Sequence, residues 1–511
     1  MESQLIITNS PSLNLKKDFF SYTFEKNTPV EVRHENGQYF THKELVNLII
    51  KKIPITQESK VLDPTCGAGA FLIEAIKKTD AENVYGVDID GKALDLCKVN
   101  LNSQKKINTK NFVKANFIKD DIFRKNSFDV VIGNPPFQNL KADGSDYDSN
   151  YPIYKKVLSN IGNSATLVLA RSYELLKDGG YMGFVLPKNF IRVDSFQNIR
   201  NFILENTKII SITDVDHHFK DVRCDQILLI LQKNKLTSED QKKNLVCITP
   251  YKRSISLKDQ ESYFVSQSEF FNYSFYPLFY NRSIKKVVDK LFKIKHILGD
   301  YCEIYRGLSI GSSHPSLSKQ KNLKLTKCYR GDSIKRFGLK YYLYLDKSKL
   351  TSGEKDKLSK LLRDKIVTQN IFSKEGGVFL NFSKADEVSL DTVTNIIPNK
   401  NINPYLLMGL LGSRLANFFL INAVYLNSNF TMHTDKSYLG KIPLVIPNSK
   451  EANLIQTYAR HLLKINDKYS KEFNDVYDKL NRIIFGLYNL NENEIRTIEE
   501  FLKSVMSKKH G

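Results

Sequence analysis

Residues 129–137 read DVVIGNPPF, an apolar strand that runs directly into the tetrad Asn134-Pro135-Pro136-Phe137. Proline lacks a backbone N–H and cannot continue a central strand, so we expect the tetrad at the carboxyl end of the strand. Open α/β sheets bind their ligands at that edge. The prolines fix a rigid turn between an amide side chain and an aromatic ring, which suits a flat amine. A turn that simply ends the strand is the alternative.

The segments around this stretch alternate between strands and helices. From about residue 36 to 235 the pattern is strand, glycine-containing turn, helix. This pattern predicts βαβ units and an α/β fold with a mostly parallel, doubly wound, Rossmann-like sheet. The predicted strands lie at 60–63, 84–88, 128–132, 181–187 and 226–232, and the first two predicted helices at 70–78 and 92–98.

Carboxylates stand at the ends of the predicted strands. Asp63 precedes a glycine turn, and an acid at that place suits a cationic α-amino group better than a phosphate. Asp88 ends the second strand, where a carboxylate can accept both ribose hydroxyls. Asp121, or its neighbour Asp120, is expected to end the next strand and to accept an exocyclic amine. The ligand implied is an amino-acid nucleoside.

The composition predicts a globular protein. The chain has 511 residues, of which 41% are hydrophobic and 26% charged, so we expect two or three domains. It contains no run of about 18 uncharged apolar residues, and its start, MESQL, does not resemble a secretory signal. We therefore expect a cytoplasmic protein with no membrane partner. The six cysteines are scattered and suggest no metal site.

The net charge of +21 and the pI of about 9.4 favour a polyanionic partner. Residues 241–350 hold about 22 lysines and arginines against about 8 acidic residues. A lysine-rich proteome could also raise the charge, but it would spread the excess evenly. The uneven distribution indicates a nucleic-acid surface in the second half.

These patterns divide the chain into four parts. Residues 1–35 form an N-terminal extension, and residues 36–240 form the doubly wound domain. Residues 241–450 show short aromatic-rich runs without a βα rhythm, which predicts a second, irregular α+β domain. Residues 451–511 have helical periodicity and are expected to form C-terminal helices.

The strand-end carboxylates and the tetrad together resemble those of the gamma-class amino DNA methyltransferases, the Taq-type and type IIG N6-adenine enzymes. Residues 37–41 (GQYFT) are similar to the segment that precedes the glycine turn in this family, although His42 stands where the family usually has proline. Residues 180–190 resemble the strand that follows the tetrad in this family. Phe219 resembles the aromatic residue that, together with the aromatic of the tetrad, sandwiches the extruded base. Residues 404–447 resemble the end of a target-recognition domain.

The resemblance implies S-adenosylmethionine as the cofactor, a methyltransferase domain at 36–240 and a DNA target-recognition domain at 241–450. It implies no metal. The cofactor-binding residues are expected to be Tyr39, Thr41, Asp63, Thr65, Gly67, Gly69, Asp88, Ile89, Asp121, Ile122 and Asn134, and the catalytic residues Asn134, Pro135, Pro136, Phe137 and Phe219.

The tetrad also suggests a mechanism. Adenine N6 is a weak nucleophile because its lone pair is delocalised into the ring. Acceptors at the Asn134 side-chain oxygen and the Pro135 carbonyl would localise that pair and stabilise the developing charge. Phe137 and Phe219 would hold the ring in line with the methyl group. A base inside a duplex must flip out to reach such a site. The loop at 141–154 either closes over the site or is a solvated insertion.

Together these inferences predict a site-specific adenine-N6 DNA methyltransferase, either of a restriction–modification system or an orphan enzyme, in the bacterial cytoplasm at the nucleoid. The expected partner is double-stranded DNA. A separate cognate restriction endonuclease would be a second partner, and a monomer is compatible with the function. An RNA adenine methyltransferase and a protein glutamine N-methyltransferase are the alternatives. The expected DNA-binding residues are Arg306, Ser309, Arg330, Lys335, Arg336 and Asn370.

Overall fold

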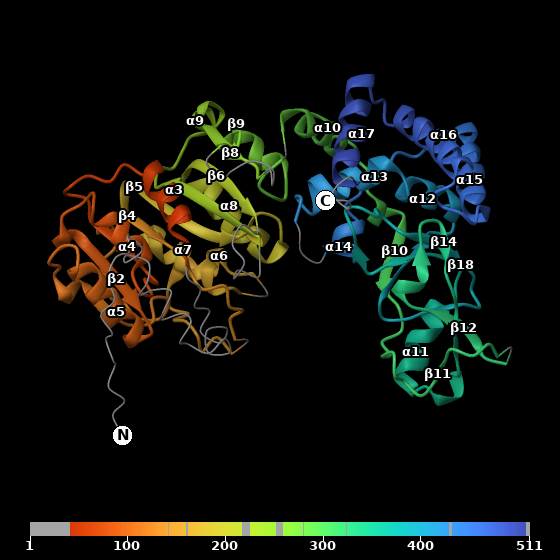
Figure 1. Ribbon diagram of the computed structural model, residues 1–511, viewed down its shortest axis with the longest axis horizontal. Helices are drawn as coiled ribbons and strands as arrows, with labels where there is room; N and C mark the ends of the chain where they lie inside the picture. Colours follow the sequence, from red (N-terminus) through yellow and green to blue (C-terminus); the bar gives the residue numbers. More distant parts are fainter. Residues whose placement is uncertain are drawn as a thin grey trace, which may run out of the picture. The chain divides into compact units, whose positions relative to one another are not determined.

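The structure, a computed structural model, divides the chain into two compact units, Met1–Leu278 and Phe279–Gly511 (Figure 1). Both units mix helices with strands. The residues that it describes are 41–141, 143–159, 162–216, 225–251, 259–279, 281–322, 324–428 and 432–506.

The first unit is built on a nine-stranded sheet with the order β3-β2-β1-β4-β5-β7-β6-β8-β9. The run from β3 to β5 is parallel, whereas β7 is antiparallel to both of its neighbours. This arrangement confirms the predicted doubly wound, Rossmann-like sheet. The strands are β1 (Val61–Asp63), β2 (Val84–Asp88), β3 (Phe112–Lys114), β4 (Phe128–Gly133), β5 (Leu176–Pro187), β6 (Lys208–Asp216), β7 (Gln226–Gln232), β8 (Leu245–Thr249) and β9 (Tyr263–Ser266).

The order of the strands reverses between β1 and β4. The chain first builds outward from β1 to β2 and β3, and then returns to the other side of β1 to form β4. The carboxyl ends of β1 and β4 therefore form the switch point at which such sheets bind ligands. The helices of this unit are α3 (Lys43–Lys52), α4 (Ala70–Ala75), α5 (Gly91–Asn102), α6 (Pro152–Val157), α7 (Ser164–Leu175), α8 (Gln197–Asn206) and α9 (Ser238–Lys243).

One apolar cluster lies between the sheet and its first helices. Apolar side chains of α3, α4 and α5 share it with residues of β1, β2 and β4. Ile49 of α3 and Val61 of β1, for example, are fully buried in it. This core supports the strand ends at the switch point.

The first unit ends later than the predicted boundary between residues 240 and 241. The lysine-rich stretch at this place forms α9, and the chain then returns to the sheet as β8 and β9. The polar composition reflects a surface helix between two strands of one sheet. The structure accordingly places the end of the unit at Leu278.

The second unit joins small sheets to helices, as expected for an irregular α+β domain. Its two larger sheets have the orders β10-β20-β16-β18 and β11-β15-β12-β19. The C-terminal helices α15, α16 and α17 pack on α12 and α13 and belong to this unit. Its strands are β10 (Cys302–Arg306), β11 (Leu317–Ser318), β12 (Thr326–Tyr329), β13 (Ile334–Lys335), β14 (Gly338–Leu339), β15 (Leu343–Leu345), β16 (Lys365–Gln369), β17 (Ile371–Phe372), β18 (Leu380–Ser383), β19 (Val388–Ser389), β20 (Val393–Pro398) and β21 (Met432–His433), and its helices α10 (Arg282–Phe292), α11 (Ser352–Leu361), α12 (Pro404–Leu411), α13 (Arg414–Phe419), α14 (Lys436–Leu439), α15 (Ser449–Lys464), α16 (Lys471–Leu487) and α17 (Glu492–Met506).

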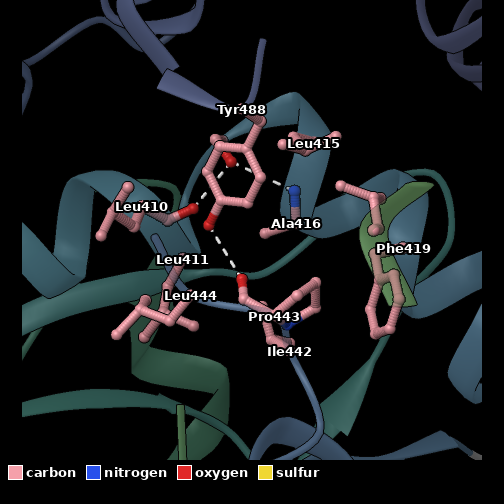
Figure 2. A pocket seen from close by; sticks show the side chains of 11 residues that line it. Leu410, Leu411, Leu415, Ala416, Phe419, Ile442, Pro443, Leu444 and Tyr488 are labelled. Carbon is pink, nitrogen blue, oxygen red and sulfur yellow. Dashed lines mark hydrogen bonds between the residues drawn. The ribbon is translucent and has the colours of Figure 1, made fainter. Parts of the chain in front are cut away.

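A small apolar pocket lies beside the break between α12 and α13 (Figure 2). Ser413 forms the break, since its hydroxyl donates to the Leu410 carbonyl at 2.7 Å and accepts from the Ala416 amide at 3.1 Å. The Tyr488 hydroxyl donates to the Pro443 carbonyl at 2.8 Å on the other side. The pocket is thus part of the packing that joins α16 to the broken helix.

The broken helix is also strongly apolar, and six of the eight residues of α12 are buried. Among the described residues no single helix is long and apolar enough to cross a membrane. When α12 and residues Arg414–Val424 are taken together, they are long and apolar enough to cross a membrane. This judgement rests on length and composition alone, and the pair is bent by 54°.

Candidate active site

β1 and β4 bring the first predicted carboxylate next to the tetrad. The two strands are parallel, with Leu62 opposite Val131, so both strands end at the same edge, and the Asp63 side chain lies against Gly133 at the end of β4. A Cβ on Gly133 would lie 2.8 Å from Asp63 Oδ1, which is closer than real side chains come. No role for Gly133 was predicted from the sequence, although a glycine at the end of an apolar strand often indicates that another group lies close to the backbone there.

Asp88, at the end of β2, holds the glycine turn that follows β1. Gly67 and Gly69 have φ angles of 51° and 92°, a region that favours glycine. The Gly67 amide donates to Asp88 Oδ2 at 2.7 Å, and the Asp90 amide donates to Oδ1 at 2.9 Å. A Cβ on Gly69 would lie 2.7 Å from Cys97 Sγ. The carboxylate predicted to bind ribose therefore also shapes the turn.

The electrostatics of this corner favour a cationic ligand. Asp63 is only 1% exposed, and the Thr65 amide donates to its Oδ1 at 3.0 Å. Burial raises the pKa of Asp63 to about 8, with a further rise from the charge of Asp88 and an opposing effect of the Thr65 amide. Burial likewise raises the pKa of Asp88. An ionised carboxylate is costly in such buried surroundings, so a positive group beside Asp63 would favour its ionised form.

Asn134 follows β4 and is fixed at two points. Its Nδ2 donates to Thr41 Oγ1 at 3.1 Å, and the Thr65 hydroxyl donates to its backbone carbonyl at 3.4 Å. Its Oδ1 is buried and has no hydrogen-bond partner among the residues that the structure describes. A buried acceptor without a donor is destabilising, so this oxygen fits a donor from a ligand. Pro135 is buried and Phe137 partly exposed beside it.

Asp121 does not lie where sequence reasoning placed it. The prediction that it ends a strand is wrong, because β3 ends at Lys114. Its side chain is 77% exposed and forms an ion pair with the buried Arg171. The alternative, Asp120, accepts the Asn116 amide at 2.8 Å. The first residue after β3 with a polar side chain is Asn116, which sequence reasoning missed because two aspartates follow it closely.

Two predicted residues lie outside the described part of the chain, namely Tyr39 and Phe219. The neighbouring Thr41 is described and is buried. His42, which replaces the proline of the resembled family, is the N-cap of α3, and its Nδ1 accepts from the Glu44 amide at 3.4 Å.

The segment after the tetrad packs on the loop that follows β3. Asn116 Nδ2 donates to the Asp146 carbonyl at 3.4 Å, and the Asp148 amide donates to the Ile118 carbonyl at 3.4 Å. The Tyr154 hydroxyl donates to the same carbonyl at 3.1 Å. The described residues of the 141–154 segment are therefore held at these points against the loop after β3. They connect the tetrad to the loop beyond β3.

In the second unit the structure brings two of the predicted DNA-binding residues together. Arg306 at the end of β10 pairs with both carboxylate oxygens of Asp435, at 3.0 and 3.2 Å. The side-chain amide of Asn370 lies 3.2 Å from the Arg306 guanidinium and 3.2 Å from Thr394 Oγ1. Asn370 is buried, so it supports Arg306 and does not form an exposed surface.

The other four predicted residues are engaged elsewhere within the second unit. Each of them contacts a side chain or a carbonyl that is distant in the sequence. Ser309 Oγ lies 2.7 Å from Lys357 Nζ, Arg330 pairs with Asp391 at 3.4 Å, Lys335 donates to the Asn466 carbonyl at 3.4 Å, and Arg336 lies 4.1 Å from the ring centre of Tyr477.

Two family models match this chain. The model of N-6 DNA methylases matches residues 14–269, and the model of the TaqI-like C-terminal specificity domain matches residues 326–444. The first match contains the whole switch point, and the second lies within the second unit.

Known proteins also resemble parts of the chain. It is 27% identical to the type II methyltransferase M.VspI of Vibrio sp. (strain 343) over 228 residues, which are 44% of this chain and 54% of that protein. It is 21% identical to the type II methyltransferase M.AccI of Acinetobacter calcoaceticus over 328 residues, or 60% of this chain and 58% of that one. The chain thus spans little more than half the length of these relatives.

A solved structure shows the same fold. The type IIL restriction-modification enzyme MmeI, in complex with DNA, matches with a TM-score of 0.60 and 13% identity. The match covers 97% of this chain and 77% of that chain. At this identity the likeness concerns the fold alone.

Proposed function

Because the chain belongs to the N-6 DNA methylase family, we propose that it transfers a methyl group from S-adenosylmethionine to the N6 amine of an adenine in double-stranded DNA. The observation that carries this proposal is Oδ1 of Asn134, a buried acceptor without a donor among the described residues. It lies at the switch point beside Asp63, where a ligand is expected. An exocyclic amine supplies the donor that this oxygen lacks.

The residues around the glycine turn fit the proposed cofactor. Asp63 would bind the α-ammonium group, and Asp88 the ribose hydroxyls. Ile89 is 62% exposed directly after Asp88 and would contact the adenine ring. Asn116 replaces Asp121 in the proposal, since it follows β3 closely. When bound, the cofactor supplies a methyl group on a sulfonium. The further proposed contacts are Tyr39, Thr41, Thr65, Gly67, Gly69 and Ile122.

The tetrad would activate the amine. Asn134 Oδ1 and the Pro135 carbonyl would each accept one N6 hydrogen, so that the nitrogen lone pair is localised and the developing positive charge is stabilised. Phe137 would stack on the base, and Phe219 is the proposed second wall. The reaction needs no covalent intermediate, and the proton can leave to solvent. The base must leave the duplex to reach this position.

The charge and the second family match support DNA as the partner. The net charge is +21, and the TaqI-like specificity model covers residues 326–444. We infer a modification enzyme of a restriction–modification system or an orphan enzyme in the bacterial cytoplasm. A separate cognate endonuclease is the further partner proposed for the first case.

The test is to express the chain in bacterial cells without adenine methylation and to read the methylated bases by single-molecule sequencing. We expect N6-methyladenine in one sequence context of the DNA. Unmodified DNA together with newly methylated RNA or protein would overturn the proposal.

A further inference from the structure

A serine outside the tetrad holds the chain on both sides of the catalytic aromatic ring. Ser164 is the first residue of α7 and is 5% exposed. Its hydroxyl donates to the Pro136 carbonyl at 2.6 Å and accepts from the Gln138 amide at 3.1 Å. Its own amide donates to the Gln138 carbonyl at 2.9 Å. The peptide groups on both sides of Phe137 are therefore tied to the start of one helix.

The tetrad needs such a support because it lacks backbone donors. Pro135 and Pro136 have no N–H and cannot be held by a β ladder. Further along, pairing with the same neighbouring segment continues, since Asn139 and Asn163 form an antiparallel bridge. Ser164 supplies the first contacts after the prolines, two through its hydroxyl and one through its backbone amide.

We propose that Ser164 is a positioning residue that orients Phe137 and the Pro135–Pro136 turn for methyl transfer. This inference rests on the proposed function. The hydroxyl bridges the Pro136 carbonyl and the Gln138 amide, so its removal takes away one hydrogen bond from each of these two partly buried groups. The turn can then rotate, and small errors in the alignment of reacting atoms lower the rate strongly. Ser164 lies outside the glycine turn, so the cofactor affinity is independent of it.

The test compares three variants of the full chain. Ser164→Ala removes the bridge, and Ser164→Thr keeps a hydroxyl at the same place. Ser172→Ala is the matched control, because Ser172 lies on the same helix and is fully buried, and its hydroxyl has no hydrogen-bond partner among the described residues. Methyl transfer to unmethylated genomic DNA gives kcat and the KM for S-adenosylmethionine. Hydrogen exchange of the Gln138 amide reports the bridge without reference to activity.

We expect Ser164→Ala to lower kcat by about tenfold to a hundredfold, with the KM for the cofactor within about twofold and faster exchange at Gln138. Ser164→Thr and Ser172→Ala should stay within about threefold of the wild type in kcat. Unchanged exchange in Ser164→Ala, or faster exchange with an unchanged kcat, would overturn the inference. A wild-type chain that methylates no adenine while Gln138 is protected would contradict the proposed function and leave the bridge itself established.

Discussion

The switch point of the first unit and the predicted DNA-binding residues of the second unit differ in what holds their polar side chains in place. Asp63 and Asp88 are the last residues of their strands and Asn134 directly follows β4, so the topology of the sheet brings them to one edge. Arg306 and Arg336 are placed by contacts with Asp435 and Tyr477, which lie far away in the sequence. When strand ends place the residues of a site, local sequence motifs can predict the site. When contacts between distant side chains place the residues, local motifs cannot predict their positions.

The two regions also differ in what their polar groups are free to do. At the switch point a buried oxygen of Asn134 has no donor among the described residues, and the pKa of Asp63 is raised, so both groups are suited to a ligand. In the second unit the predicted arginines already have partners within the unit. The comparison predicts that changes at the switch point abolish function, while changes at these arginines alter stability first.

The largest effect is expected for Asn134→Ala. This variant removes the acceptor for the N6 amine, so kcat should fall by about a thousandfold or more. The Kd for S-adenosylmethionine, measured by calorimetry, should stay within about threefold, because the contacts proposed for Asp63 and Asp88 are unchanged by the substitution. A kcat near that of the wild type would remove the basis of the mechanism.

Gly133→Ala should come next. The added Cβ would lie 2.8 Å from Asp63 Oδ1 and would displace this carboxylate. We expect the Kd for the cofactor to rise by about tenfold or more, as for the loss of a buried charged contact. Gly353→Ala in α11 is the control, because nothing lies within 4 Å of its added Cβ. Equal effects of the two substitutions would contradict the close approach of β1 and β4.

The third prediction concerns pH. Because the pKa of Asp63 is about 8 in the free protein, this carboxyl is mostly protonated at pH 6, and binding of an ammonium group must release its proton. The affinity for S-adenosylmethionine should therefore rise roughly tenfold from pH 6 to 7.5, until the amino group of the cofactor begins to lose its own proton. Asp63→Asn should bind weakly and lose this rise. Asp95→Asn, on the exposed side of α5, should retain it.

The smallest effects are expected for basic residues of the second unit, where exposed lysines should differ from an arginine that contacts another side chain of the unit. Lys319, Lys321 and Lys324 are exposed between β11 and β12. Their replacement by glutamine should reduce the slope of log K for DNA against log salt by about two to three. Arg336→Gln should leave the slope unchanged and lower the melting temperature, because its guanidinium lies against Tyr477. The reverse pattern would show that Arg336 faces the DNA.

Much of the first unit was predictable because strand ends leave strong local signals. The proline pair stops β4 at a known place, and the glycines mark the turn after β1. Asp121 was misplaced because β3 has only three residues, so its end cannot be recognised from apolar periodicity. The predicted domain boundary at residue 240 lies before the end of the first unit, because the polar, lysine-rich composition of α9 is also typical of a linker. The partners of Arg306 could not be predicted, since no local pattern connects residues 306 and 435.

The measurement that tests the central claim most directly is product analysis with S-adenosylmethionine labelled on its methyl group. The purified chain and unmethylated duplex DNA are incubated, and the nucleosides are separated and identified by mass spectrometry. The account predicts label on N6 of adenine with the wild type and none with Asn134→Ala, although both proteins bind the cofactor. Label on cytosine, or equal labelling of adenine by the two proteins, would contradict it.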